Sequence, residues 1–174
     1  MNTHPTNIQG VENVVPDDSV DATGWTLNLL NPQLPSRYFP TGISHVNWSL
    51  VRVGALQGLH YSLGHTLLWV TRGMAQIVVL DLNKTSPSYT SHFSIDLHED
   101  VMLGVYAPPK TAIGILGIGP TTQVLTLTDD HNSIAPINPR DSRLKIDWGI
   151  PPDAIPLKRD EAEMDVASWI SKYL

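Results

Sequence analysis

The feature that most constrains the fold is a series of short apolar segments between Ser44 and Leu127. Several alternate apolar and polar residues, as at Val46, Trp48 and Leu50, which is the pattern of a strand with one buried face. Turn-forming residues separate the segments at intervals of about ten residues, which is typical of an antiparallel barrel or sandwich. The expected strands are residues 44–53, 67–71, 75–82, 89–97, 101–107, 111–118 and 123–127.

The two ends of the chain differ from this middle part. Residues 1–20 are polar and interrupted by proline, which predicts an N-terminal arm, either loose or forming a short edge strand. We expect one domain over residues 21–174, because the length suits a single core and no repeat or linker divides it. A helix is expected only over residues 160–173, where apolar side chains recur at near-helical spacing.

Charge and composition exclude several classes of function. The net charge of −6 and the absence of a Lys/Arg cluster argue against a nucleic-acid surface. Without cysteine, disulfides and thiolate chemistry are excluded. No apolar run approaches the ~20 residues that span a bilayer, and the first residues lack the pattern of a signal peptide. We therefore expect a cytoplasmic protein, in contact with neither nucleic acid nor membrane.

His60 is the strongest candidate for chemistry. It lies in an apolar segment beside Gly58, and His65 follows five residues later. An imidazole titrates near ~6.5, so one carboxylate partner suffices to make it a base at neutral pH. A metal site is disfavoured, because two histidines five apart face opposite sides of a regular strand and no Glu follows them until Glu99. A hydrogen-bonded structural histidine is the remaining interpretation.

Other catalytic patterns are weak or absent. The chain has no Gly-x-Ser-x-Gly elbow for a nucleophile and no Gly-rich loop that opens a helix for phosphate. Asp129-Asp130-His131 fits either the mouth of a barrel or a solvated turn. Trp48 and Trp69 fit either ring stacking against a ligand or core packing.

Several short motifs keep a fixed order over residues 21–162. They are Gly58-Leu59-His60-Tyr61, Arg72-Gly73, Asp81-Leu82 with Ser86-Pro87-Ser88-Tyr89, residues 107–112, Asp141 with Ile146-Asp147-Trp148, and Lys158-Arg159-Asp160. In this order they resemble the dTDP-4-dehydrorhamnose 3,5-epimerases and related deoxysugar epimerases. The resemblance implies an all-β jelly-roll cupin barrel with a short C-terminal helical segment. It also implies a homodimer formed through exchanged strands, with neither metal nor other cofactor.

The resemblance further implies roles for particular residues. In that family a His, oriented by an Asp, removes a proton from the carbon next to the sugar's 4-keto group. A Lys stabilises the enolate, and a Tyr returns a proton from the opposite face. Here His60 matches the base and Asp160 its partner carboxylate, while His131 is the expected occupant of the Tyr position. The Lys position holds Thr66, and the family's second His is replaced by Ile113.

The expected substrate-binding positions depart from the family pattern. The family's Asp-x-Arg-Gly-x-Phe-x-Glu appears as residues 21–28 without its Arg, Phe or Glu, and Gln57 replaces the Arg before Gly-Leu-His. Each lost arginine removes charge-assisted contacts to a diphosphate, worth about 1.5–3 kcal/mol. The predicted substrate-binding residues are Asn47, Gln57, Ser62, Thr66 and Trp69.

Three functions are compatible with this sequence. The first is an epimerase or isomerase acting on a 4-keto-deoxysugar nucleotide through His60. The second is a diverged cupin that acts on a non-nucleotide small molecule in a biosynthetic pathway, as a cyclase or isomerase. The third is a non-catalytic binding module in which His60 is structural. Ancestry favours the first function, and the loss of phosphate-binding arginines favours the second as regards the substrate.

Overall fold

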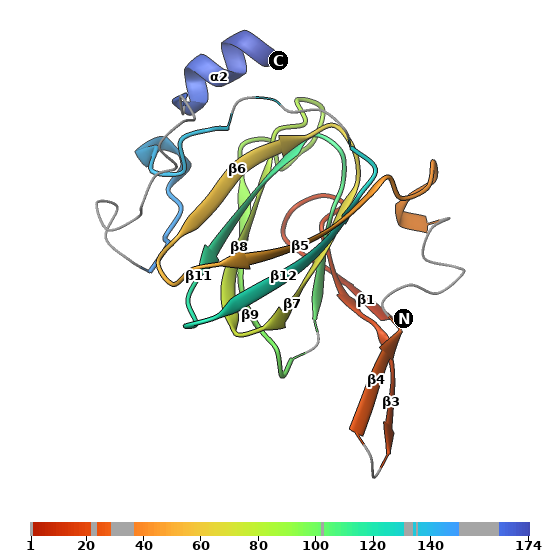
Figure 1. Cartoon of the computed structure of the whole chain (residues 1–174). Coiled ribbons are helices and arrows are strands. Elements are labelled where there is room, and N and C mark those ends of the chain that lie inside the picture. The colour runs from red at the N-terminus through yellow and green to blue at the C-terminus, as the bar shows by residue number, and fades with distance from the viewer. Residues whose placement is uncertain are drawn as a thin grey trace.

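The computed structural model describes residues 2–21, 24–28, 37–101, 103–130, 134, 136–149 and 164–174. Its strands form two antiparallel sheets that pack face to face, and a separate hairpin (Figure 1). In spatial order the six-stranded sheet contains β1 (Asn2–Pro5), β2 (Glu12–Val15), β10 (Gly104–Ala107), β7 (Thr66–Arg72), β12 (Thr122–Thr128) and β5 (His45–Val51). The four-stranded sheet contains β6 (Leu56–Ser62), β11 (Thr111–Gly117), β8 (Met74–Asp81) and β9 (His92–His98).

The remaining elements are β3 (Asp17–Asp21) with β4 (Gly24–Asn28), the short helix η1 (Ser142–Leu144), and α2 (Val166–Tyr173). This arrangement confirms the prediction of an all-β jelly roll with a short C-terminal helix. Residues 160–163 of the expected helix lie outside the described residues. No helix is long and apolar enough to cross a membrane in the part of the chain that the structure describes.

One predicted strand begins later than expected because a turn precedes it. The buried Asp81, 2% exposed, ends β8 and organises the residues that follow. Its Oδ1 accepts a hydrogen bond from the Asn83 amide (2.9 Å), and its Oδ2 accepts one from Ser88 Oγ (2.7 Å). A side chain that bonds the backbone two residues on stabilises a turn. The chain therefore re-enters the sheet at His92 rather than at Tyr89.

The N-terminal residues take part in the main sheet. β1 is an edge strand, and β2 pairs with both β1 and β10. Ile8, Val11 and Val14 are buried, so this segment contributes to the core. The predicted boundary between residues 20 and 21 falls within β3, and the β3–β4 hairpin projects away from the two packed sheets (Figure 1).

Alternation along the strands divides the apolar side chains into three clusters. The first lies between the sheets and includes Leu68, Ile77, Val79, Ile113 and Val124. The second covers the outer face of the four-stranded sheet, and the third covers the outer face of the six-stranded sheet. Burial at about 25 cal/mol per Å² of apolar surface is the main force that holds the two sheets together.

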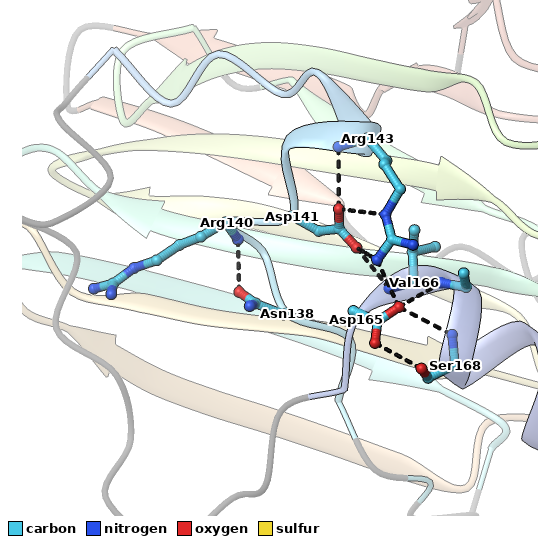
Figure 2. Close-up of polar contacts among 8 residues, drawn as sticks. Asn138, Arg140, Asp141, Arg143, Asp165, Val166 and Ser168 are labelled. Carbon is cyan, nitrogen blue, oxygen red and sulfur yellow. Dashed lines mark hydrogen bonds and ion pairs between the residues drawn. The ribbon is translucent and has the colours of Figure 1, made fainter.

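The C-terminal part of the chain seals the outer face of the four-stranded sheet. Trp148 and Trp169, 6% and 0% exposed, pack in the outer cluster of this sheet. A polar clamp joins η1 to the start of α2: Arg143 Nη2 lies 2.7 Å from Asp141 Oδ2 and 2.5 Å from Asp165 Oδ1 (Figure 2). Asp165 also caps α2 by accepting hydrogen bonds from the amides of residues 167 and 168.

The clamp has a measurable electrostatic consequence. Asp141 Oδ2 also accepts a hydrogen bond from the Val166 amide at 2.7 Å (Figure 2). The hydrogen bonds from Arg143, followed by those from backbone amides, lower the pKa of Asp141 to about 2. The same ion pair raises the pKa of Arg143 and contributes to lowering that of Asp165. These charges fix α2 over the outer cluster.

Candidate functional site

A cavity of about 290 Å³ is lined by inward-facing side chains of both sheets. The lining combines polar groups with an apolar wall, and His60 is among its exposed members. The described lining residues are Asn47, Gln57, His60, Tyr61, Ser62, Thr66, Leu68, Ile113, Ile115, Thr126, Thr128 and Asp130. A volume of this size lies at the small end of the ~300–1,000 Å³ that is typical of small-molecule sites.

A bulge in β6 brings Gln57 and His60 to the same face. On a regular strand, residues three apart face opposite sides. In β6, however, His60 pairs with Ile113 and Gln57 pairs with Ile115, so two residues of β6 lie opposite Gly114 alone. Gly58 adopts a φ of 105°, where side chains are strained, and a Cβ there would collide with the Ile113 carbonyl oxygen. The bulge therefore requires glycine at this position.

The backbone groups freed by the bulge find partners outside the sheet. The Leu59 amide donates to the Ile137 carbonyl (3.3 Å), and the Ile137 amide donates to the Leu59 carbonyl (3.0 Å). These two bonds attach the C-terminal segment to the strand that carries His60. They also satisfy polar groups that would be costly to bury unpaired.

Uncharged polar side chains of the six-stranded sheet form another part of the cavity wall. Thr126 pairs with Asn47 on β5, and Thr128 pairs with Thr66 on β7, so these four side chains lie on neighbouring strands. They present hydroxyl and amide groups that can hydrogen-bond a sugar-like ligand. Ile113 and Ile115 project from β11 of the facing sheet.

Asp130 is an acidic group in the lining. Its Oδ2 accepts hydrogen bonds from Ser62 Oγ (2.9 Å) and from the Leu63 amide (2.7 Å). The negative charge also acts on Tyr61, whose pKa is raised, first by burial and then by Asp130. This places a carboxylate beside the strand that carries His60.

The structure brings five of the predicted site residues together at the cavity and places a sixth, Trp69, elsewhere. His60, Asn47, Gln57, Ser62 and Thr66 all line the cavity. Trp69 is 2% exposed and packs in the cluster on the outer face of the six-stranded sheet. Alternate residues of a strand face opposite sides, so Trp69 points outward because Thr66 and Leu68 point into the cavity. Asp160 and His131 lie outside the described residues.

Several lining residues were not selected from the sequence. Thr126 and Thr128 could have been found by alternation, since Val124 and Leu127 already assign the two faces of β12. Asp130 lies after the end of β12, where strand alternation gives no guide to which way a side chain points. The sequence left open whether Asp130 lies at the mouth of a barrel or in a solvated turn, and the structure places it in the cavity lining, bonded to Ser62 and Leu63.

His65 belongs to a different site from His60. Its Nδ1 lies 2.6 Å from Tyr106 Oη, and its amide donates to Asp129 Oδ1 at 2.6 Å. Burial, followed by the charge of Glu12, raises the pKa of Tyr106 to about 12, so the phenol keeps its proton. Among the residues that the structure describes, no three His, Asp or Glu side chains gather as a metal site would need.

Comparisons with known proteins identify relatives of this chain. The model of the dTDP-4-dehydrorhamnose 3,5-epimerase family matches residues 5–168. A comparison with curated protein sequences found no match. Among solved structures, the dTDP-4-dehydrorhamnose 3,5-epimerase of Elizabethkingia anophelis is similar, with a TM-score of 0.86 at 21% identity and 97% of each chain covered.

Two further solved structures were determined as complexes. The dTDP-6-deoxy-D-glucose-3,5-epimerase of Legionella pneumophila, in complex with dTDP-4-keto-L-rhamnose, has a TM-score of 0.86 at 20% identity, with 96% of this chain and 93% of that chain covered. A 3′-monoepimerase of Streptomyces bikiniensis, in complex with dTDP-quinovose, has a TM-score of 0.81 at 22% identity, with 94% and 87% covered. At these identities the likeness shows a common fold.

Proposed function

Because the chain belongs to the dTDP-4-dehydrorhamnose 3,5-epimerase family, we propose that it is an isomerase of a 4-keto-deoxysugar in which His60 removes a proton next to the carbonyl. The observation that carries the proposal is the position of His60. The bulge at Gly58 orients the imidazole toward a small cavity. The other polar side chains that line this cavity can form hydrogen bonds with the hydroxyl groups of a sugar. A neutral imidazole in such a site is a competent general base at neutral pH.

The proposed reaction moves protons only. The C–H bond next to the carbonyl breaks, its proton passes to the imidazole, and its electron pair forms an enolate. For the stabilisation of the enolate oxygen we propose the hydroxyl group of Thr66 and the amide group of Asn47, because both residues line the cavity. Inversion then needs a proton from the opposite face. For this step we propose His131, and for the orientation of His60 we propose Asp160.

The proposed substrate in its first form is a nucleotide-linked sugar. The Legionella and Streptomyces structures hold dTDP-sugars, and family membership extends that substrate class to this chain as a hypothesis. The second form is a small molecule without a nucleotide. One observation favours it: no described residue that lines the cavity is Lys or Arg.

We also propose that the working unit is a homodimer. The β3–β4 hairpin projects from the body of the protein, as a strand exchanged with a second copy would (Figure 1). Light scattering after gel filtration tests this, and a monomer mass would contradict it. The cytoplasmic location expected from the sequence stays a prediction.

Solvent exchange tests the proposed chemistry. In D2O the protein should exchange the protons next to the carbonyl of dTDP-4-keto-6-deoxyglucose, or of a methyl 6-deoxyhexopyranosid-4-ulose, as followed by proton NMR. The His60→Asn variant should be about 10²–10⁴-fold slower, the usual contribution of a general base. The His98→Asn variant, with its half-exposed side chain on β9, is the matched control. Full exchange by His60→Asn would exclude His60 as the base, and no exchange by the wild type would favour a binding module.

A further inference from the structure

The charges around the cavity carry information about the substrate. Among the described lining residues, the wall is apolar at Leu68, Ile113 and Ile115, and the remaining groups are neutral polar side chains, His60 and the acidic Asp130. None is a permanent cation. Phosphate recognition in proteins relies on Arg, Lys or arrays of backbone amides, because charge-assisted hydrogen bonds are about twice as strong as neutral ones.

Several described cations are placed elsewhere. Arg37 pairs with Glu12 at 3.1 Å, and Arg143 is held in the α2 clamp. Arg72 ends β7 at the opposite end from Thr66, which is about 20 Å away at 3.3 Å per residue. Arg52 is exposed and does not line the cavity. None of these four arginines lines the cavity beside His60.

Asp130 adds a negative charge to the site. Ser62 Oγ and the Leu63 amide hold its Oδ2 in place, so the carboxylate is oriented at the cavity wall. A carboxylate accepts hydrogen bonds from ligand hydroxyl groups and repels a diphosphate. Its effect is strengthened because the apolar wall lowers the local dielectric constant.

From these observations we infer that the substrate is an uncharged, hydroxyl-bearing carbonyl compound the size of one sugar ring, without a diphosphate, and that Asp130 determines this specificity. The inference rests on the proposed function, since it names the substrate class for the same proton transfer. The cavity volume of about 290 Å³ fits a single ring with a small substituent.

The test compares two probes with the same ring. One is methyl 6-deoxyhexopyranosid-4-ulose, which is neutral, and the other is dTDP-4-keto-6-deoxyglucose. We expect deuterium exchange with a higher kcat/KM for the methyl glycoside, and no inhibition by millimolar dTDP. A nucleotide sugar that is used as well as or better than the methyl glycoside overturns this inference and leaves the proposed proton transfer standing. Exchange with neither probe overturns the proton transfer itself.

Two substitutions test the part played by charge. Asp130→Asn keeps the acceptor oxygen for Ser62 and Leu63 and should reduce the preference for the methyl glycoside at least tenfold. Asp129→Asn is the matched control: its carboxylate bonds His65 and Thr41 outside this cavity, and the preference should not change. Should Asp130→Asn fail to fold, Gln57→Arg supplies a cation in the lining and should make dTDP inhibit at least tenfold more strongly. An unchanged preference in Asp130→Asn, or unchanged inhibition in Gln57→Arg, overturns the inference.

Discussion

The two faces of the four-stranded sheet differ in how they relate to the epimerase family. The outer face is sealed by Trp148 and Trp169 and fixed by the clamp between Asp141 and Arg143. The inner face contributes His60, with Ile113 on the neighbouring strand, to an open cavity. Both faces are built from the same strands, so any difference between them comes from the side chains that alternate along each strand.

Several residues of the expected family motifs hold the fold, whereas three residues that depart from these motifs line the cavity beside His60. Asp81 organises the turn after β8, Asp141 binds η1 to α2, and Trp148 fills the outer cluster. Gln57, Thr66 and Ile113, which depart from the pattern, all belong to the cavity lining. Three of the departures expected from the resemblance therefore fall in the cavity lining. The following predictions test this division, beginning with the largest expected effect.

Truncation of Trp169 should affect stability and not chemistry. This side chain is fully buried, and its ring lies 4.8 Å from that of Tyr61. Trp169→Ala should lower the free energy of unfolding by about 3–5 kcal/mol, measured by urea denaturation. Val101→Ala, at a position that is 50% exposed, should change it by less than about 0.5 kcal/mol. Similar losses in both variants would show that burial on the outer face does not explain the effect.

Alanine substitutions at two glycines with positive φ distinguish the cost of backbone strain from the cost of a steric collision. Gly54→Ala should cost about 1–2 kcal/mol, because its φ is 73° but no atom lies within 4 Å of the new Cβ. Gly58→Ala should cost about 3 kcal/mol and also abolish proton exchange, since the collision with Ile113 displaces the bulge. Denaturant unfolding and the NMR exchange assay measure the two effects. Equal costs, with activity retained, would contradict the role given to the bulge.

The clamp should make stability depend on acid. The pKa of Asp141 falls from 3.8 to about 2 on folding. The ionised Asp141 therefore contributes to the free energy of unfolding above pH 4, and this contribution is lost as the pH falls through 2. Asp141→Asn should lower the free energy of unfolding at pH 7 by about 2 kcal/mol and remove this part of the acid dependence. Asp100→Asn, whose side chain is 86% exposed, should do neither. If the free energy of unfolding depended on pH in the same way in the wild type and in Asp141→Asn, the stabilising role given to the clamp would be wrong.

Lys110 gives the smallest expected effect. It has a φ of 67° in the turn between β10 and β11, a backbone conformation that favours glycine. Lys110→Gly should therefore raise the free energy of unfolding by up to about 1 kcal/mol. Lys110→Ala keeps the strained φ and should give no gain. A gain in both variants would mean that the lysine side chain, and not the backbone, is unfavourable there.

The sequence predicted the parts of the molecule that depend on local pattern. Strand alternation located β5 and β7–β12, while β6 was expected only as an apolar, strand-like segment, and the glycine beside His60 drew attention to this histidine. Trp69 was assigned to the substrate site on residue type, although its odd position on β7 directs it outward. The Arg143–Asp165 contact joins residues 22 apart, and Asp130 reaches Leu63 from 67 residues away. No local pattern specifies such contacts, because they depend on how complete elements pack.

The most direct test of the account is the rate of deuterium exchange per folded molecule in His60→Asn, measured beside Trp169→Ala. We expect side chains on the inner face of the four-stranded sheet to determine the rate of proton exchange, and those on its outer face to determine the free energy of unfolding. We expect folded His60→Asn to lose exchange about 10²–10⁴-fold, and Trp169→Ala to exchange at the wild-type rate once corrected for the folded fraction. Wild-type exchange by folded His60→Asn would contradict the central claim.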